Sequence, residues 1–362
     1  MKNWRNIFIL SILVGLAACT KVEDVYVPET ISYSVGSYAN VTKANSHLND
    51  QENITSFRSK AWLHTVENPN GAQFFDEVIT YDGTSEWLPS HDYYWPKGPQ
   101  SYINFVSWHA NTGTADIVPA EVTETVFRIA DREIGAEDRV LIADEAWRQK
   151  NNTTPATYYT TGVPTLFHNL LTRVKVNFSA TLVTDPENSN VTYEVILQDA
   201  HFEGLYLRGS LTLNNVALDT KGTREWFSTA SPTYLWTATS GSNNTNVPLC
   251  NTNTTLSVAG TNILAERSFL PQSLNNVNLV LTYTVTTRSG GTITISENNI
   301  PATVVMKNIK NASAVAITEW VPNKKYTYNI AINPVNNEIL LNPVVETDWS
   351  SISDYQYSVT VE

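Results

Sequence analysis

The sequence predicts an all-β protein with two antiparallel β-sandwiches in series. Charged residues make up only 16% of the 362 residues, and aromatic residues make up 10%. Much of the polar remainder is Thr, Asn and Ser, a mixture that suits pleated, half-buried strands better than helices. Apolar and polar residues alternate with a period of two in several segments, which is typical of strands with one face in a core. The length suits two domains of ordinary size.

The first 18 residues are expected to be a removable leader. Lys2 and Arg5 precede the apolar run 7–16, which ends in Leu16-Ala-Ala-Cys19. A charged start, a short apolar run and small residues before a cysteine are typical of a bacterial lipoprotein signal. The run is too short to cross a bilayer core of about 30 Å. We expect lipid on Cys19, which would hold the chain to a membrane surface without inserting its body.

Strand patterns then follow in order along the chain. Residues 102–108 are apolar on both faces, which predicts a central strand covered on each side. For 138–143 a short buried strand is favoured over a helix. The polar stretch 150–155 is the best candidate for a domain linker. The expected division is therefore a leader at 1–18, an N-terminal segment at 19–45, a first sandwich at 46–160 and a second at 161–362.

The second half of the chain carries the clearest alternation. Residues 277–285 and 292–295 flank Arg288-Ser-Gly-Gly291, which predicts a β-hairpin. Segments 174–178 and 326–332 each place their apolar residues on one face. Tyr355, Tyr357, Val359 and Val361 alternate with polar residues in the same way. Cys250 has no partner if Cys19 carries lipid, and a small buried hydrophobic role is expected for it.

Composition and motifs give no support for an enzyme. The formal net charge is −12, and the absence of a basic cluster argues against a nucleic-acid partner. The histidines are scattered without metal-ligand spacing, and no phosphate-binding or nucleophile motif occurs. We therefore expect no catalytic residues, no metal and no cofactor. A glycosidase pair among Glu77, Asp82 and Glu86 is a weak alternative, because sequence cannot place two carboxylates across a cleft.

Aromatic residues are concentrated between 87 and 108. Core packing is the favoured interpretation, because a sandwich needs large buried side chains. The alternative is an exposed platform that stacks on sugar rings. That alternative would make the protein a surface glycan-binding lipoprotein, with contacts at Trp87, Tyr93, Trp95 and Trp108.

A series of short segments follows a family pattern when the segments are taken in order. They are Tyr94-Trp-Pro96 with Tyr102-Ile-Asn-Phe105, 138–143, 166–176, Phe269-Leu-Pro-Gln272, Trp320 with 323–332, and Asp348-Trp349. Their order and spacing resemble the fimbrillin family, the Mfa-like subunits of type V pili. The spacing after Phe167-His168 departs slightly from the family pattern. The resemblance implies Greek-key, transthyretin-like sandwiches and a structural subunit of a fimbria with a role in adhesion.

The resemblance also implies assembly by strand exchange. A lipidated precursor would reach the outer membrane through Cys19, and a trypsin-like protease would remove its first strand. Another pilin subunit, of the same or a different kind, would then fill the vacated groove. The removable strand would be 31–35, with Ile31, Tyr33 and Val35 on one face. Cleavage would fall between Lys43 and Ala44, with Arg58 as the alternative.

The C-terminal strand pattern has two possible roles under this resemblance. Tyr355, Tyr357, Val359 and Val361 could form the donor strand for a neighbouring subunit, or they could complete the second sandwich. The sequence leaves the stalk, tip and anchor positions open.

Overall fold

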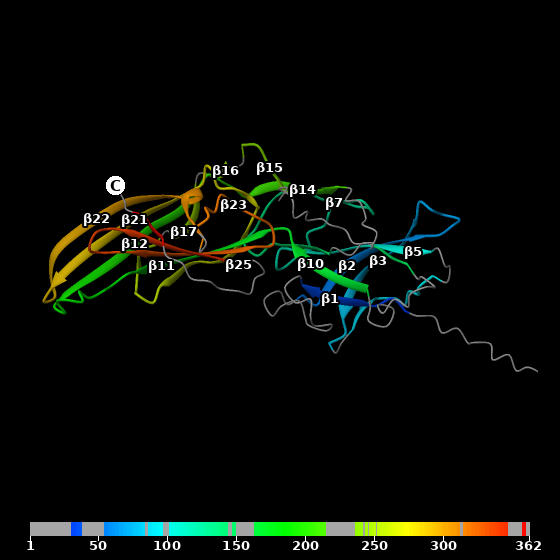
Figure 1. Ribbon diagram of the computed structural model, residues 1–362, viewed down its shortest axis with the longest axis horizontal. Coiled ribbons are helices and arrows are strands. Elements are labelled where there is room, and N and C mark those ends of the chain that lie inside the picture. The colour runs from blue at the N-terminus through cyan, green and yellow to red at the C-terminus, as the bar shows by residue number, and fades with distance from the viewer. Residues whose placement is uncertain are drawn as a thin grey trace, which may run out of the picture.

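The computed structural model is an elongated all-β molecule with two lobes along its longest axis (Figure 1). The structure describes residues 30–37, 54–83, 86–96, 101–143, 147–149, 163–214, 236–241, 243–244, 246–250, 252–311, 314–346 and 357–359. Over these residues it contains strands and a short 3₁₀ turn, η2 (Met306–Asn308), but no α-helix. The predicted all-β class is confirmed. In the described part of the chain no helix is long and apolar enough to cross a membrane.

The N-terminal lobe is built on an eight-stranded sheet. Its order is β2-β3-β4-β1-β10-β8-β5-β9, and β2 also pairs with β5. The strands are β1 (Tyr33–Ser37), β2 (Ser56–His64), β3 (Ala72–Tyr81), β4 (Trp87–Pro89), β5 (Tyr102–Asn111), β8 (Arg139–Ala143), β9 (Trp147–Gln149) and β10 (Val163–Asn169). The segment 138–143 therefore forms a strand, as predicted.

Strand β5 separates two hydrophobic cores. Ile103 and Phe105 face one core together with residues of β1, β2, β3 and β10. Val106 and Trp108 face the other core together with residues of β7 and β14. All four side chains are buried, with 5% exposure or less. The prediction of a central strand covered on both faces is confirmed.

A four-stranded sheet closes the second of these cores. Its order is β15-β14-β7-β6, with β6 (Glu121–Val122), β7 (Val126–Glu133), β14 (Arg208–Asn214) and β15 (Trp236–Ala238). Strands from before and after residue 160 thus pair here, as β8 and β10 do in the larger sheet. Sheet pairing crosses the expected domain boundary, and the division at 160 stays a prediction.

The C-terminal lobe is a β-sandwich. One sheet has the order β19-β11-β24-β25-β26, and the other has the order β17-β12-β21-β22 with β18 beside β12. The first comprises β11 (Thr172–Ala180), β19 (Thr261–Phe269), β24 (Lys325–Ile332), β25 (Ile339–Glu346) and β26 (Tyr357–Val359). The second comprises β12 (Val191–Glu203), β17 (Val247–Cys250), β18 (Thr254–Thr255), β21 (Asn278–Ser289) and β22 (Thr292–Val305). Short ladders join β13 (Leu205–Tyr206) to β16 (Asn243–Asn244) and β20 (Gln272–Ser273) to β23 (Glu319–Trp320).

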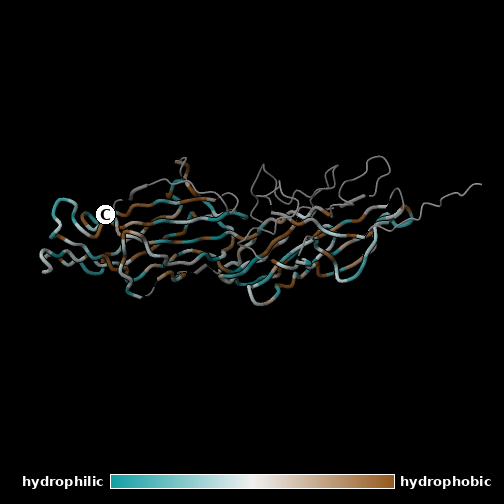
Figure 2. Tube along the Cα trace, turned by 90° about the horizontal axis from the view of Figure 1, so that it is seen from below, coloured by the Kyte–Doolittle hydropathy of each residue, from teal (hydrophilic) through white to brown (hydrophobic). Residues whose placement is uncertain are grey.

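The alternation in the sequence explains how the two sheets pack. Val174, Val176 and Phe178 of β11 are fully buried, and β24 buries every second residue from Tyr326 to Ile332. These faces meet the apolar face of β21 in one core. Figure 2 shows apolar stretches along the interior strands of both lobes and polar loops at the far end of the C-terminal lobe. The hairpin predicted around residues 288–291 is formed by β21 and β22.

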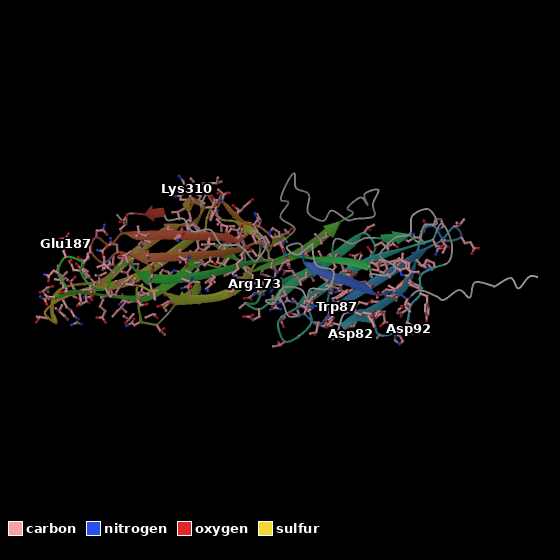
Figure 3. The ribbon with its side chains drawn as sticks, turned by 60° about the horizontal axis from the view of Figure 1, so that its bottom comes forward. Asp82, Trp87, Asp92, Arg173, Glu187 and Lys310 are labelled. Carbon is pink, nitrogen blue, oxygen red and sulfur yellow. The ribbon has the colours of Figure 1, made fainter. Side chains whose placement is uncertain are left out.

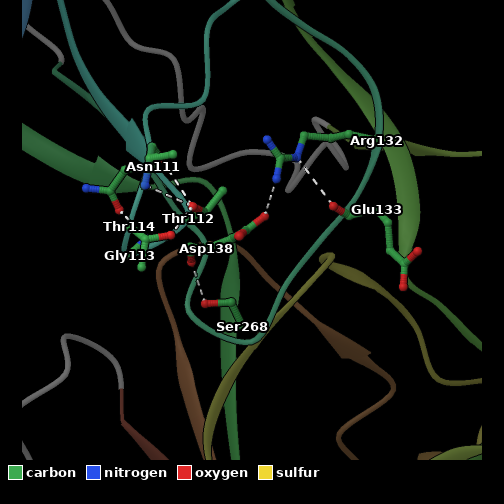
Figure 4. A network of polar contacts seen from close by, with 9 residues as sticks. Asn111, Thr112, Gly113, Thr114, Arg132, Glu133, Asp138 and Ser268 are labelled. Atoms are coloured by element: carbon green, nitrogen blue, oxygen red, sulfur yellow. Dashed lines mark hydrogen bonds and ion pairs between the residues drawn. The ribbon is translucent and has the colours of Figure 1, made fainter.

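A polar network joins the two lobes. Ser268, in β19 of the C-terminal sandwich, donates its hydroxyl to the carbonyl of Asp138 at 2.7 Å. The Asp138 carboxylate in turn pairs with Arg132 of β7 at 2.8 Å (Figure 4). Ser268 N also donates to Ala136 O at 2.9 Å. The loop before β8 is thereby tied to the first sheet of the C-terminal lobe.

Candidate assembly site

The predicted first strand forms β1 in the interior of the eight-stranded sheet. It pairs in parallel with β10, from Tyr33↔Val163 to Ser37↔Phe167, and it meets β4 at Tyr33↔Trp87. At its start, Ile31 N donates to Tyr93 O at 2.7 Å and Val163 N donates to Ser32 O at 2.7 Å. β1 therefore has a neighbour on each side.

The core residues that β1 packs against are hydrophobic, and several are aromatic. Ile31, Tyr33 and Val35 have exposures of 1%, 3% and 5%. The Tyr33 ring packs edge-on against Phe57 at 5.5 Å and Phe105 at 5.8 Å between ring centroids. We call the groove that holds these three side chains the β1 slot. Burial of three large side chains contributes on the order of 5–8 kcal/mol relative to exposure.

A chain of buried hydroxyl groups lies at the floor of the β1 slot. Tyr33 donates its hydroxyl to Ser59 of β2 at 2.8 Å, and the Ser59 hydroxyl lies 2.9 Å from that of Ser107 in β5. Ser59 and Ser107 are 0% and 2% exposed. Burial raises the pKa of Tyr33 far above its ordinary value, although the Ser59 hydrogen bond opposes this shift. The phenol therefore stays protonated and remains a donor.

The sequence did not identify the two serines. Ser59 stands between Arg58 and Lys60, Ser107 stands between Val106 and Trp108, and a lone serine in a strand carries no local signal for a buried hydrogen bond. Only the pairing of β2 with β5 brings Ser59 opposite Ser107. A signal could have come from the tyrosine alone, because a buried Tyr hydroxyl needs a partner.

Of the predicted lipidation and cleavage positions, the structure describes only Arg58. Cys19, Lys43 and Ala44 lie outside the residues that the structure describes. Arg58 lies within β2, opposite Val78 on one side and Trp108 on the other. Its guanidinium pairs with Asp76 at 2.7 Å.

The candidate donor strand lies at the sheet edge of the C-terminal lobe. Tyr357 and Val359 belong to β26, which pairs with β25 from Ile339↔Val359 to Leu341↔Tyr357. Over the described residues β25 is its one neighbour. Tyr355 and Val361 lie outside the described residues.

The three tryptophans between 87 and 108 do not form an exposed platform. Trp87, Trp95 and Trp108 are 4%, 2% and 5% exposed, so their proposed role as sugar-stacking surfaces is wrong. Trp87 packs against Phe57 beside β1, where Figure 3 labels it. Tyr93 is half-buried and donates its hydroxyl to Glu77 at 2.8 Å. The core-packing interpretation is confirmed for the three tryptophans.

A pocket of about 350 Å³ opens beside β2 and β3. Its walls carry charges of both signs, from Arg58, Lys60, Asp76, Asp116 and Glu121. Mixed charge of this kind selects no ligand class. Within the described ranges, no group of His, Cys, Asp and Glu residues is arranged to hold a metal ion. Cys250 is buried and unpaired by any disulfide, as the sequence suggested.

A family model described as fimbrillin-like matches residues 42–349. The chain belongs to the fimbrillin-like family. The fimbrillin-like match spans both lobes, and it supports a role as a pilus subunit at the cell surface. It also favours a structural over an enzymatic role.

Solved structures of bacterial proteins resemble this fimbrillin-like chain at low sequence identity. A candidate cell adhesion protein from Bacteroides uniformis is 14% identical, with a TM-score of 0.47 over 89% of this chain and 98% of that one. A fimbrial protein from Bacteroides vulgatus is 14% identical, with a TM-score of 0.41 over 91% and 98%. A fimbrial assembly protein from Parabacteroides distasonis is 9% identical, with a TM-score of 0.39 over 90% and 99%. No curated protein matches the chain.

Proposed function

We propose that this protein is a pilus subunit that assembles by strand exchange, with β1 as the removable strand. The observation that carries the proposal is the position of β1. It is the first described strand in the chain, yet it fills an interior slot between β4 and β10. A single cut between β1 and β2 would leave it attached by noncovalent contacts alone.

The physical argument concerns what β1 leaves behind. Its departure would expose an aromatic groove and a row of unpaired backbone groups on β10. Both are costly in water, and a complementary strand from another subunit would restore both. Before cleavage, the covalent link keeps β1 at a local concentration on the order of millimolar. Cleavage removes that advantage and allows a competing strand to enter.

Lys43 is the better of the two cleavage candidates. It lies between β1 and β2 in the chain, so a cut there would release β1 and leave β2 intact. A cut after Arg58 would divide β2 while it is paired on both sides, which requires local unfolding of the sheet first. A lipid on Cys19 would hold the precursor at the outer membrane until the cut is made. Adhesion would then be a property of the assembled fimbria.

Limited trypsin digestion tests this proposal. The purified full chain should be cut after Lys43, giving a product that begins at Ala44 and converts from monomer to higher-order species. Lys43→Gln should leave the chain monomeric under the same digestion, as measured by sedimentation and mass spectrometry. The proposal would be contradicted if trypsin failed to cut at Lys43 in the folded chain and no processed chain formed higher-order species.

A further inference from the structure

We propose that residues 90–95, which directly follow β4, form a strap that holds the start of β1, and that Glu77 of β3 closes this strap. The strap acts in the uncleaved chain, so its existence does not depend on strand exchange. Where strand exchange takes place as proposed above, the strap also sets how fast a cleaved chain releases β1. Figure 3 labels Asp92, which lies within the strap.

The two sides of β1 are paired to very different extents. β1 has five paired positions with β10, but its ladder with β4 consists of one pair, at Tyr33. The strap continues the pairing on the β4 side. Ile31 N donates to Tyr93 O at 2.7 Å, and Thr30 forms an isolated antiparallel bridge with Tyr94. On this side, the start of β1 is therefore held by the strap rather than by β4.

Three side chains of the strap converge on the carboxylate of Glu77. Tyr93 donates its hydroxyl to Glu77 Oε1 at 2.8 Å, and His91 Nδ1 lies 3.1 Å from the same oxygen. Ser90 donates its hydroxyl to Glu77 Oε2. The hydrogen bonds from Ser90 and Tyr93 hold the pKa of Glu77 below its ordinary value, because they stabilise the charged form. Glu77 is therefore an ionised acceptor at neutral pH.

The register of β3 explains why Glu77 requires these partners. Glu77 lies opposite Ser59 of β2 and alternates with Phe75 and Ile79 along β3. Residues paired across two strands share a face, and Ser59, Phe75 and Ile79 are all buried. Glu77 thus lies on the core face of β3, with its side chain 16% exposed. A carboxylate at such a position is costly without hydrogen-bond donors, and the strap supplies them.

Aromatic packing joins the strap to the core that β1 fills. The Tyr93 ring lies 4.6 Å from Phe75 and 5.6 Å from Phe74 between centroids. Trp95 is 2% exposed, and its ring lies 6.1 Å from Phe105, which also packs against Tyr33 of β1. The rings therefore keep the strap close to the core, while the hydroxyl and carboxylate contacts fix its position against β1. Glu77 is a positioning residue, because it acts on β1 through the strap.

Amide hydrogen exchange in the uncleaved chain tests the strap. Glu77→Gln keeps the size of the side chain but removes its charge, and the weakened hydrogen bonds correspond to about a tenfold change in the opening equilibrium. The Ile31 amide should therefore exchange about tenfold faster, whereas the protected amides of β5 in the same lobe should keep their rates. Asp76→Asn is the matched control, because it removes the neighbouring carboxylate, which pairs with Arg58 instead of the strap. An unchanged Ile31 rate in Glu77→Gln, or equal acceleration of Ile31 and β5, would overturn the strap.

Tyr93→Phe is a second variant that keeps the ring and removes one hydroxyl donor. It should accelerate exchange at Ile31 about fivefold, and it keeps the test decisive should Glu77→Gln fold poorly. Combining Tyr93→Phe with Glu77→Gln should add little, because both changes weaken the same contact. Independent, multiplying effects of the two changes would overturn the role of Glu77 in closing the strap.

The cleaved chain tests the consequence for assembly. Each variant is cut after Lys43, and loss of the N-terminal fragment is followed by mass spectrometry after separation by size. The fragment should leave Glu77→Gln about tenfold faster than it leaves the native chain or Asp76→Asn. Equal release from the native and Glu77→Gln chains would overturn the control of release by the strap. Faster exchange at Ile31 without release from any cleaved chain would support the strap and contradict strand exchange instead.

Discussion

At the scale of the residue, buried tyrosines make the fold sensitive to alkaline pH. Burial raises the pKa of Tyr326 to about 12, and it shifts the pKa of Tyr33 and Tyr328 further upward. Tyr328 accepts a hydrogen bond from the Trp320 indole at 2.9 Å. Each phenol is therefore held neutral in the folded state at a pH where an unfolded chain would ionise it.

We expect stability to be independent of these phenols below pH 10 and to fall above it. The folded-state pKa of Tyr326 lies above its unfolded value of 10, so the unfolded state loses its proton first as the pH rises. The loss is about 1.4 kcal/mol per pH unit for each such tyrosine, or roughly 3 kcal/mol for Tyr326 between pH 10 and 12. The loss of stability is measured as the fall of the urea unfolding midpoint between pH 8 and 11.5. Tyr326→Phe should remove the contribution of one proton from the slope of the free energy of unfolding against pH. A free energy of unfolding that stays constant between pH 10 and 11 would contradict the raised pKa values of these tyrosines.

The carboxylate of Asp138 is the second residue whose removal should be costly. Its side chain is 3% exposed and pairs with Arg132, which is 28% exposed. Asp138→Asn should lower the free energy of unfolding by about 2 kcal/mol, less than a fully buried pair because water reaches Arg132. Asp76→Asn removes the more exposed pair with Arg58 and should cost about 0–1 kcal/mol. Equal losses in denaturant unfolding would contradict a larger contribution from the buried Asp138–Arg132 pair than from the exposed Asp76–Arg58 pair.

At the scale of the element, the β21–β22 hairpin depends on two glycines. Gly290 and Gly291 have φ values of +56° and +85°, and a Cβ at either would meet open space. A substitution there is therefore strained by backbone conformation alone. Gly291→Ala should destabilise the fold by about 1 kcal/mol, whereas Gly290→Asn should be nearly neutral because Asn tolerates this region. Thermal unfolding of the two variants distinguishes them, and a harmless Gly291→Ala would contradict the turn geometry.

Strand existence could be predicted from the sequence, but strand partners could not. The alternation in residues 326–332 and the glycines at 290–291 are local signals, and both predicted their elements. The pairing of β14 with β7 joins residues far apart in the chain, and no periodicity encodes such a choice. For the same reason Ser59 and Ser107 were missed at the site. Tyr33 and Val35 were placed on the correct face because their alternation is itself local.

At the scale of the whole molecule, the proposed strand exchange assigns complementary parts of one assembly reaction to the two lobes. The N-terminal lobe holds β1 in an interior slot, and the C-terminal lobe carries β26 at a sheet edge. The Asp138 network between the lobes ties the sheets that bear these strands (Figure 4). An accepting site and a donating strand on one elongated body would propagate a linear polymer, because each copy would leave one free slot and one free strand.

Truncation of the C-terminal strand should separate the ability to accept a strand from the ability to donate one. A full chain that ends at residue 354 keeps the β1 slot but lacks Tyr355, Tyr357, Val359 and Val361. After cleavage at Lys43 it should accept a strand from an intact copy and then stop growth, so it should shorten polymers in proportion to its fraction. Sedimentation of mixtures measures the length. Unchanged polymer length at high fractions of the truncated chain would contradict the donor role of this segment.

A reversible lock on β1 tests the central claim most directly. Val35 and Thr165 are paired neighbours on β1 and β10, and adjacent strands lie about 4.8 Å apart, within the range that a disulfide can bridge. The variant Val35→Cys with Thr165→Cys is oxidised, cleaved after Lys43 and analysed by sedimentation with and without reductant. The account predicts monomers while the disulfide holds β1 in its slot and polymers once the disulfide is reduced. Polymers of equal size in both states would contradict it.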